Sequence, residues 1–169
     1  CCTDYNGCNG GDYPLAWDYV GKHGLETEAD YPYVGAEQVC QYNSSKAMAG
    51  LAKVNNEYST SIGAYWRGEY GTPEEIMTAV AIRPAAVGIN ASGFRFQTYE
   101  SGVLTNCTAT SMNHAVTMDG YDSTASTPYF SVRNSWGEGW GQGGYVLMGM
   151  QAGNSKGVCG VQQDVDYPN

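Results

Sequence analysis

The sequence predicts an α+β fold, in which a helical first third is followed by a β-rich remainder. Two observations support this division. Helix start and stop signals mark the first part of the chain, whereas short apolar or alternating runs broken by Gly, Asn, Asp and Pro follow from Pro84 onward. A chain of 169 residues is long enough for one compact domain or two small lobes.

The first predicted element is a helix over Tyr13–His23. Pro14 suits its first turn, and apolar residues recur near helical spacing along it. Cationic residues in the last turn precede Gly24, which is typical of a helix C-terminus. We therefore interpret His23 as a capping or surface residue.

A second helix is predicted from Thr72 to Ala81. Thr72 is a suitable N-cap, Pro73 fits the first helical position, and two glutamates follow in the first turn. Antiparallel strands in a sandwich or barrel are predicted after it. Their expected ranges are Ala85–Ile89, Ala115–Met118, Tyr129–Val132 and Tyr145–Met148.

The charge balance argues against several classes of partner. Eight Lys and Arg residues against 17 Asp and Glu residues leave a net charge of −9. So acidic a surface disfavours nucleic acid and anionic membranes, and no apolar run is long enough to cross a bilayer. The six cysteines lack paired C-x-x-C spacings and only two histidines are present, so we predict no metal site and no cofactor.

The six cysteines and three Asn-x-Ser/Thr sequons favour a disulfide-forming secretory route. The sequons begin at Asn43, Asn90 and Asn106. The chain begins with Cys1 and Cys2 rather than a methionine, which we interpret as a processed or truncated end.

Two glycine motifs are rejected as functional signals. Residues 139–144 match G-x-G-x-x-G, but a predicted strand follows them instead of the helix that a dinucleotide site needs. Residues 153–157 match G-x-S-x-G, but no histidine follows Ser155 to act as the base of such a hydrolase.

His114 and Asn134 form the pattern with the clearest chemical meaning. His114 begins one apolar run, and Asn134 follows another 20 residues later. An imidazole base needs a partner that fixes its tautomer, and an Asn oxygen does this without adding charge. A neighbouring indole, Trp136, can keep water away from their hydrogen bond. We therefore expect the His114 and Asn134 side chains within hydrogen-bonding distance, with the Trp136 ring against them.

Five ordered motifs extend this pattern along the chain. They are Gly7-Cys8-Asn9-Gly10-Gly11, Tyr31-Pro32-Tyr33, Asn113-His114-Ala115-Val116, the segment from Asn134-Ser135-Trp136-Gly137 to Gly144-Tyr145, and Val158-Cys159-Gly160 with Tyr167-Pro168. Together they resemble the papain family of cysteine peptidases over nearly the whole chain. The resemblance implies a papain-like two-lobed fold, with residues 1–56 as the remainder of a helical lobe and 57–169 as a β-barrel lobe with a C-terminal tail.

The resemblance implies a cysteine endopeptidase that hydrolyses peptide bonds in a cleft between the lobes. In that family the residue matching His114 is the general base and acid, and the one matching Asn134 orients it. Trp136 would shield their hydrogen bond, and Trp140 would support the site. A lysosomal, vacuolar or secreted glycoprotein is expected, with a peptide or protein as substrate.

The resemblance also implies residues that bind substrate. Gly10 and Gly11 would offer backbone to an extended peptide, because a missing side chain lets that backbone approach closely. The positions that match the second specificity pocket of the family are Tyr13, Gly88, Met112 and Asp164. Asn113, which precedes the histidine, is also expected to bind substrate. Gly88 would leave this pocket roomy. An acidic floor at Asp164 resembles family members that accept basic as well as large apolar side chains, but Asp164 is equally consistent with a surface carboxylate.

A glycan at Asn90 would crowd the primed side of the cleft, so we expect that sequon to be unoccupied.

The nucleophile of the family is not among these residues. Its signature is a cysteine followed by Trp or Tyr about 130 residues before the histidine, and none of the six cysteines here is followed by either. We therefore expect the catalytic Cys and the oxyanion glutamine on an N-terminal fragment upstream, and the chain alone to be inactive. The alternative is a catalytically inactive papain-like module with a binding or structural role.

The resemblance implies two disulfides, Cys1–Cys40 and Cys107–Cys159. The family partner of Cys8 lies upstream, so Cys8 is expected to be unpaired within this chain. Cys2 has no counterpart: it could replace Cys1, pair with Cys8, or stay free. If the upstream segment is absent, apolar surface including parts of Trp17 and Trp136 is expected to face solvent.

Overall fold

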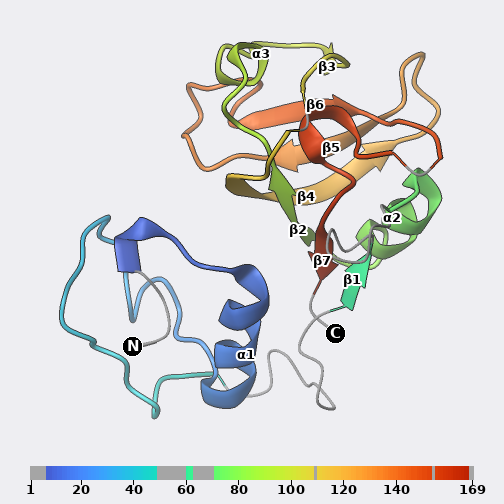
Figure 1. The fold of residues 1–169 in the computed structure, drawn as a ribbon. Helices are drawn as coiled ribbons and strands as arrows, with labels where there is room; N and C mark the ends of the chain where they lie inside the picture. Colours follow the sequence, from blue (N-terminus) through green and yellow to red (C-terminus); the bar gives the residue numbers. More distant parts are fainter. Residues whose placement is uncertain (1–6, 49–59, 63–70, 109, 154, 168–169) are drawn as a thin grey trace. The chain divides into compact units, whose positions relative to one another are not determined.

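The structure is a computed structural model that describes residues 7–48, 60–62, 71–108, 110–153 and 155–167. The chain divides into two compact units, one of residues 1–60 with 168–169 and one of residues 61–167 (Figure 1). The expected lobe boundary between residues 56 and 57 lies outside the described residues. We call these parts unit 1 and unit 2 and describe each by itself.

Unit 1 contains a short 3-10 helix, η1 (Gly7–Asn9), and the helix α1 (Tyr13–His23). The prediction of α1 is confirmed at both ends. Gly24 ends the helix with φ of 77°, and its N–H donates to the carbonyl of Val20 at 2.7 Å. His23 is exposed and its ring lies 4.7 Å from that of Tyr19, which agrees with a surface role.

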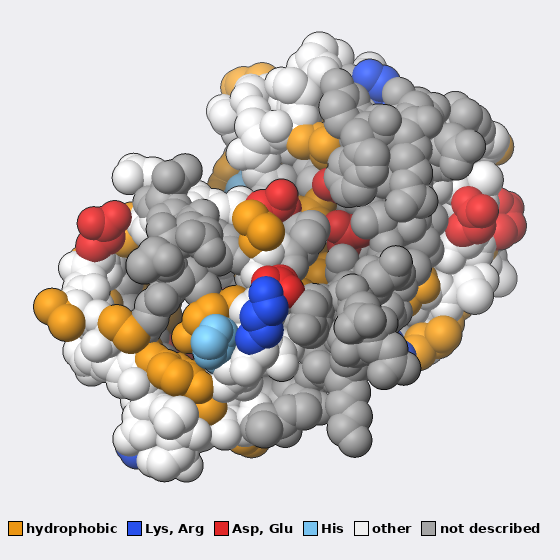
Figure 2. Space-filling view, turned by 60° about the horizontal axis from the view of Figure 1, so that its bottom comes forward, with side chains coloured by type: hydrophobic (Ala, Val, Ile, Leu, Met, Phe, Trp, Pro, Cys, Tyr) orange, Lys and Arg blue, Asp and Glu red, His pale blue; other side chains and the backbone are white. Residues whose placement is uncertain are grey.

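Unit 1 buries little of itself. Among its residues whose exposure is described, only Gly24 is buried. Large hydrophobic side chains such as Tyr33 and Val39 are 86% exposed, and Figure 2 shows hydrophobic side chains, in orange, open on the surface. A unit that leaves such side chains in solvent lacks the closed apolar core that normally stabilises a small domain.

Unit 2 is built on a sheet of seven strands in the order β1-β7-β2-β4-β5-β6-β3. The strands are β1 (Thr60–Ile62), β2 (Ala85–Ile89), β3 (Val103–Leu104), β4 (His114–Asp122), β5 (Tyr129–Arg133), β6 (Tyr145–Gly149) and β7 (Val165–Tyr167). The central pairs are antiparallel, and β3 runs parallel to β6. The helices of this unit are α2 (Pro73–Val80), α3 (Phe94–Gln97) and the 3-10 helix η3 (Val158–Gly160). Figure 1 shows the strands curled together with α2 at one end, so the predicted α+β fold is confirmed.

The four predicted strands all exist, but β4 is longer than the expected Ala115–Met118. It continues to Asp122 through a register shift between Met118 and Gly120. Asp119 and Gly120 end the apolar run in the sequence, whereas the ladder with β5 continues past them to Asp122, where exposed residues alternate with half-buried ones. The short strands β1, β3 and β7 were not predicted, because two or three residues carry too little periodicity.

The core of unit 2 lies between the sheet and its covering segments. Its largest fully buried side chains include Ile76, Ile89, Phe96, Met118, Phe130 and Met148. Burial of each side chain of this size contributes about 1.5–3 kcal/mol relative to leaving it in water. In contrast to unit 1, this core can hold a site rigidly.

A buried glutamine joins three segments of unit 2. Gln162 is fully buried, and its Nε2 donates to the carbonyls of Gly71 at 3.1 Å and Gln151 at 3.0 Å. Its Oε1 accepts from the backbone N–H of Gln151 at 2.9 Å. Because buried polar groups without partners are costly, these bonds fix the start of α2 and the end of β6 to the C-terminal segment.

The N-terminus of α2 has the predicted cap. The Thr72 hydroxyl accepts from the backbone N–H of Glu75 at 3.3 Å, and the Glu75 carboxylate accepts from the backbone N–H of Thr72 at 3.0 Å. We expect Thr72→Ala to lower the free energy of unfolding by about 1 kcal/mol, because the backbone N–H of Glu75 loses the hydroxyl that accepts from it. Urea unfolding checks this. Thr78→Ala, inside the same helix, is the control, and an equal loss in both variants would contradict a role for the cap.

Within the described residues, no helix has both the length and the apolar character needed to cross a membrane.

Candidate active site

The strands β4 and β5 bring His114 and Asn134 together. His114 is the first residue of β4, and Asn134 directly follows β5, its antiparallel neighbour. The Nε2 of His114 lies 2.8 Å from the Oδ1 of Asn134. Asn134 is buried and His114 is half-buried. The predicted hydrogen bond between these two side chains is therefore confirmed.

A second hydrogen bond fixes which way the Asn134 amide faces. Its Oδ1 also accepts from the backbone N–H of Ser135 at 2.8 Å. A backbone N–H only donates, so the amide atom that faces both Ser135 and His114 is the oxygen. The Nε2 of His114 must then carry the proton and donate it. In the neutral imidazole the lone pair is on Nδ1, which is the nitrogen left to accept a proton.

Trp136 covers one face of the imidazole. Its ring stacks on that of His114 with centroids 5.3 Å apart and an interplanar angle of 28°. Phe96 and Trp140 meet Trp136 edge to face, each at 5.4 Å, and so hold the indole in place. The predicted packing of Trp136 against this pair is confirmed. Trp136 is nevertheless 43% exposed, so its other side faces solvent in this chain.

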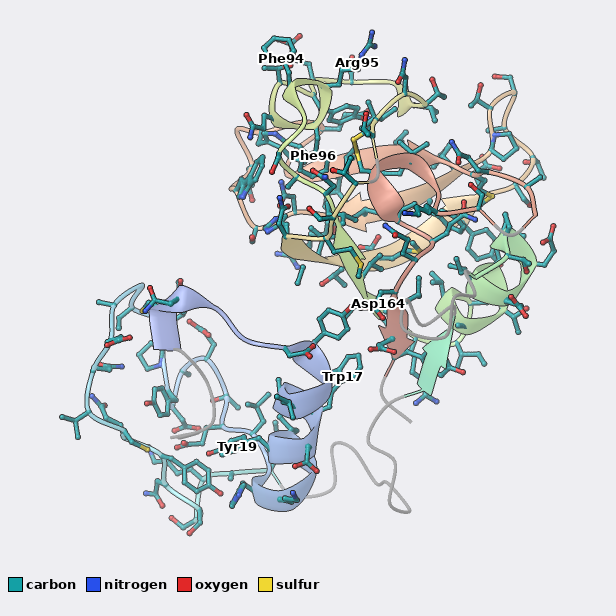
Figure 3. All side chains as sticks on the ribbon, viewed as in Figure 1. Trp17, Tyr19, Phe94, Arg95, Phe96 and Asp164 are labelled. Atoms are coloured by element: carbon teal, nitrogen blue, oxygen red, sulfur yellow. A yellow bond between two sulfur atoms is a disulfide. The ribbon has the colours of Figure 1, made fainter. Side chains whose placement is uncertain are left out.

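Trp140 links this aromatic cluster to α3. Its Nε1 donates to the carbonyl of Gln97 at 3.1 Å. Figure 3 shows Phe96 directed into unit 2, whereas Phe94 and Arg95 point outward, and Phe96 is fully buried. Phe96 was missed as a supporting residue, because nothing in its local sequence marks a contact with a tryptophan 40 residues later.

Asn113 anchors the segment that leads into His114. Its Nδ2 donates to the Ser92 hydroxyl at 2.5 Å, and its Oδ1 accepts from the backbone N–H of Ala91 at 2.9 Å. Its own N–H donates to the carbonyl of Ile89, which pairs with His114 across the sheet. The side chain expected to bind substrate is thus engaged in holding two loops together. Ser92 carried no motif that could have predicted this role.

The structure brings some of the expected pocket residues close together. The Gly88 N–H donates to the carbonyl of Asp164 at 3.1 Å, and Gly88 pairs with Ala115, the neighbour of His114. Asp164 and Met112 are half-buried, and Figure 3 shows Asp164 at the base of the β2 and β7 region. The other expected substrate-binding residues, Gly10, Gly11 and Tyr13, lie in unit 1 at or just before the start of α1.

The cysteines follow the expected pattern where they are described. Cys107 and Cys159 form a disulfide, as predicted. Cys8 is free and exposed, which confirms the expectation that it has no partner within this chain. Cys40 is disulfide-bonded, while its expected partner Cys1 lies outside the described residues, as does Cys2.

The described part of the chain holds no group of three or more His, Cys, Asp or Glu side chains placed to bind a metal ion. The site itself offers an imidazole with a fixed tautomer, a polar orienting group and an aromatic cover. Such a pair serves as a proton acceptor and donor for a nucleophile placed at Nδ1.

Comparison with known proteins identifies close relatives of the whole chain. The family model described as papain family cysteine protease matches residues 1–169. A thiol protease of Hemerocallis sp. is 36% identical over 99% of the chain, and a senescence-specific cysteine protease of Arabidopsis thaliana is 38% identical over the same share. The chain spans only 44% and 46% of the length of these two proteins.

Solved structures agree with the sequence relatives. A bromelain protease from Ananas comosus in complex with the E64 inhibitor is 32% identical, with a TM-score of 0.81 over 100% of this chain and 74% of that one. The Amb a 11 cysteine protease, a ragweed pollen allergen solved in its proform, is 32% identical with a TM-score of 0.83 over 99% of this chain and 49% of that one.

Proposed function

Because this chain belongs to the papain family of cysteine proteases, we propose that it forms the histidine and asparagine half of a papain-like cysteine endopeptidase. The observation that carries the proposal is the hydrogen bond from His114 Nε2 to Asn134 Oδ1. Because that oxygen also accepts from Ser135, the bond leaves Nδ1 as the proton acceptor. An imidazole held in this tautomer is what a thiol nucleophile needs for activation.

The proposed reaction uses His114 twice. Nδ1 accepts the proton of a cysteine thiol, and the resulting thiolate attacks the carbonyl carbon of the substrate peptide bond. The imidazolium then gives its proton to the departing amine, and it later removes a proton from the water that hydrolyses the acyl-enzyme. Asn134 keeps the ring in position through both steps, and Trp136 limits the access of water to their bond.

In this proposal, the cysteine that supplies the thiolate lies outside these 169 residues. Cys107 and Cys159 form a disulfide with each other, and Cys40 is disulfide-bonded as well, so none of these three offers a free thiol. The free thiol of Cys8 lies in η1 of unit 1 and is followed by Asn9, not by the Trp or Tyr of the family's nucleophile. The 43% exposure of Trp136, whose ring stacks on that of His114, supports a segment that covers this ring and carries the nucleophile.

The proposed substrates are peptides and proteins. By the resemblance, the position of Gly88 would leave room for a large side chain, and a carboxylate at Asp164 would accept a basic one. The alternative that Asp164 is a surface carboxylate stands beside this proposal. The proposed compartment is vacuolar, lysosomal or extracellular, since the Cys107–Cys159 disulfide requires an oxidising route.

The role of Asn134 provides the first test. In the full-length protein, Asn134→Ala is expected to lower kcat by about 10²-fold. Little change in KM is expected, because the variant loses the orientation of the imidazole but keeps the contacts to the substrate. Asn134→Asp keeps an acceptor oxygen and is expected to retain more activity than Asn134→Ala.

Ser126→Ala is the control, because it removes an exposed polar group from the same unit, and full activity is expected. Equal kinetics for wild type and Asn134→Ala would contradict the proposed mechanism. A wild-type protein with no peptidase activity would favour the inactive papain-like module instead.

A further inference from the structure

The three sequons lie in different surroundings in the folded chain. An Asn-x-Ser/Thr sequon is modified on the Nδ2 of its asparagine, and the attached glycan is bulky and hydrophilic. A glycan is compatible with the fold only where this nitrogen is exposed and not already used by the protein. By these two conditions, exposure and hydrogen bonding, Asn43 and Asn106 differ from Asn90.

Asn43 satisfies both conditions. It is exposed in a turn of unit 1, and its Oδ1 accepts from the backbone N–H of Ser45 at 3.0 Å and from the Ser45 hydroxyl at 2.7 Å. The hydroxyl that the sequon requires thus already contacts the side-chain amide. The Nδ2 of Asn43 makes no hydrogen bond to any residue that the structure describes.

Asn106 is exposed between β3 and β4, and within the described ranges its side chain has no hydrogen-bond partner. The next residue, Cys107, is tied by its disulfide to the fully buried Cys159. This bridge anchors the loop to the core of unit 2. A glycan on Asn106 would therefore stand on a fixed point of the surface without disturbing packed side chains.

Asn90 fails both conditions. It is only 5% exposed, and its Nδ2 donates to the Thr110 hydroxyl at 2.6 Å. Its Oδ1 accepts from the backbone N–H of Ser92 at 3.0 Å, and its backbone N–H donates to the carbonyl of Cys159 at 2.7 Å. A sugar on Nδ2 would occupy the position of Thr110 and bury hydroxyl groups without partners, which is costly. A chain glycosylated here could not reach this fold.

We propose that the folded protein carries N-linked glycans on Asn43 and Asn106 and none on Asn90. The donor is an oligosaccharide linked to a lipid diphosphate, transferred by the glycosyltransferase of the secretory route. A bond forms between Nδ2 and the anomeric carbon of the first sugar, while the bond from that carbon to the phosphate oxygen breaks. The lipid diphosphate leaves, and one amide proton passes to solvent. The proposal rests on the secretory route and not on peptidase activity.

The test is a site-by-site glycan analysis of the full-length protein secreted from a eukaryotic host. A glycosidase that converts each glycosylated Asn to Asp, followed by peptide mass mapping, is expected to give Asp at 43 and 106 and Asn at 90. Ser45→Ala and Thr108→Ala should each remove one glycan while keeping the asparagine. Ser44→Ala lies within the first sequon but leaves its motif intact, so it should keep the glycan on Asn43.

Asn at position 43 or 106, or Asp at position 90, in the secreted protein would overturn the proposal. The same map made on His114→Ala separates this result from the proposed catalysis. The glycan pattern is expected to be unchanged in that variant, whatever happens to its activity.

Discussion

Replacing His114 with alanine in the full-length protein is expected to lower kcat/KM for peptide substrates by about 10⁴-fold or more. In the proposed mechanism the imidazole activates the thiol and protonates the leaving amine, so both halves of the reaction would lose their proton carrier. His114 has its Nε2 committed to Asn134 at 2.8 Å and its face covered by Trp136 at 5.3 Å, and no other described histidine shares this arrangement.

His23 provides the matched control for this prediction. It is the second of the two histidines in the chain and lies exposed at the end of α1, beside Tyr19 and Tyr42. His23→Ala is expected to retain full activity. A similar loss of activity in both variants would indicate a general effect on folding, and retained activity in His114→Ala would contradict the assigned role of this residue.

Removing the Cys107–Cys159 disulfide is expected to give the largest loss of stability. The bridge closes a loop with a sequence separation of 52 residues, and loop-closure entropy for that length corresponds to about 4 kcal/mol. Cys159 is also fully buried in the core of unit 2. The double variant Cys107→Ala with Cys159→Ala, unfolded in urea, should show this loss as a lower transition midpoint.

Thr108→Ser, an exposed change beside the bridge, is the control and is expected to stay within about 0.5 kcal/mol of wild type. An equal stability of the double variant and the wild type would show that the disulfide does not constrain the unfolded chain. The C-terminal segment of unit 2 would then be held by its other contacts, such as the hydrogen bonds of Gln162.

The parts of the fold that the sequence predicted are those with local signals. Pro14 and Gly24 mark the two ends of α1, and Thr72 with Glu75 marks the start of α2; all four positions do what their chemistry predicts. The strand of His114 was predicted too short because Gly120 interrupts the apolar run, while the hydrogen-bonded ladder continues past it.

The parts that the sequence could not predict depend on contacts between distant segments. The motif around His114 and Asn134 indicated their pairing, but the polar links from Asn113 to Ala91 and Ser92 arise only when β2 and β4 pair in register. The burial of Asn90 likewise follows from its place at the end of β2. The sequence of a sequon does not reveal whether it lies on a surface loop or in a core. An unoccupied Asn90 was predicted from the sequence for a different reason, which was that a glycan there would crowd the substrate.

Covalent labelling of the nucleophile tests whether the catalytic cysteine lies outside this chain while His114 activates it. The full-length protein is treated with an irreversible thiol-directed peptidyl electrophile, digested, and mapped by mass spectrometry for the labelled cysteine. We expect a label on a single cysteine outside these 169 residues, and loss of that label in His114→Ala, because the thiolate depends on the imidazole. This is the result that the proposed mechanism requires. A label on Cys8, or a folded wild-type protein that takes up no label, would contradict it.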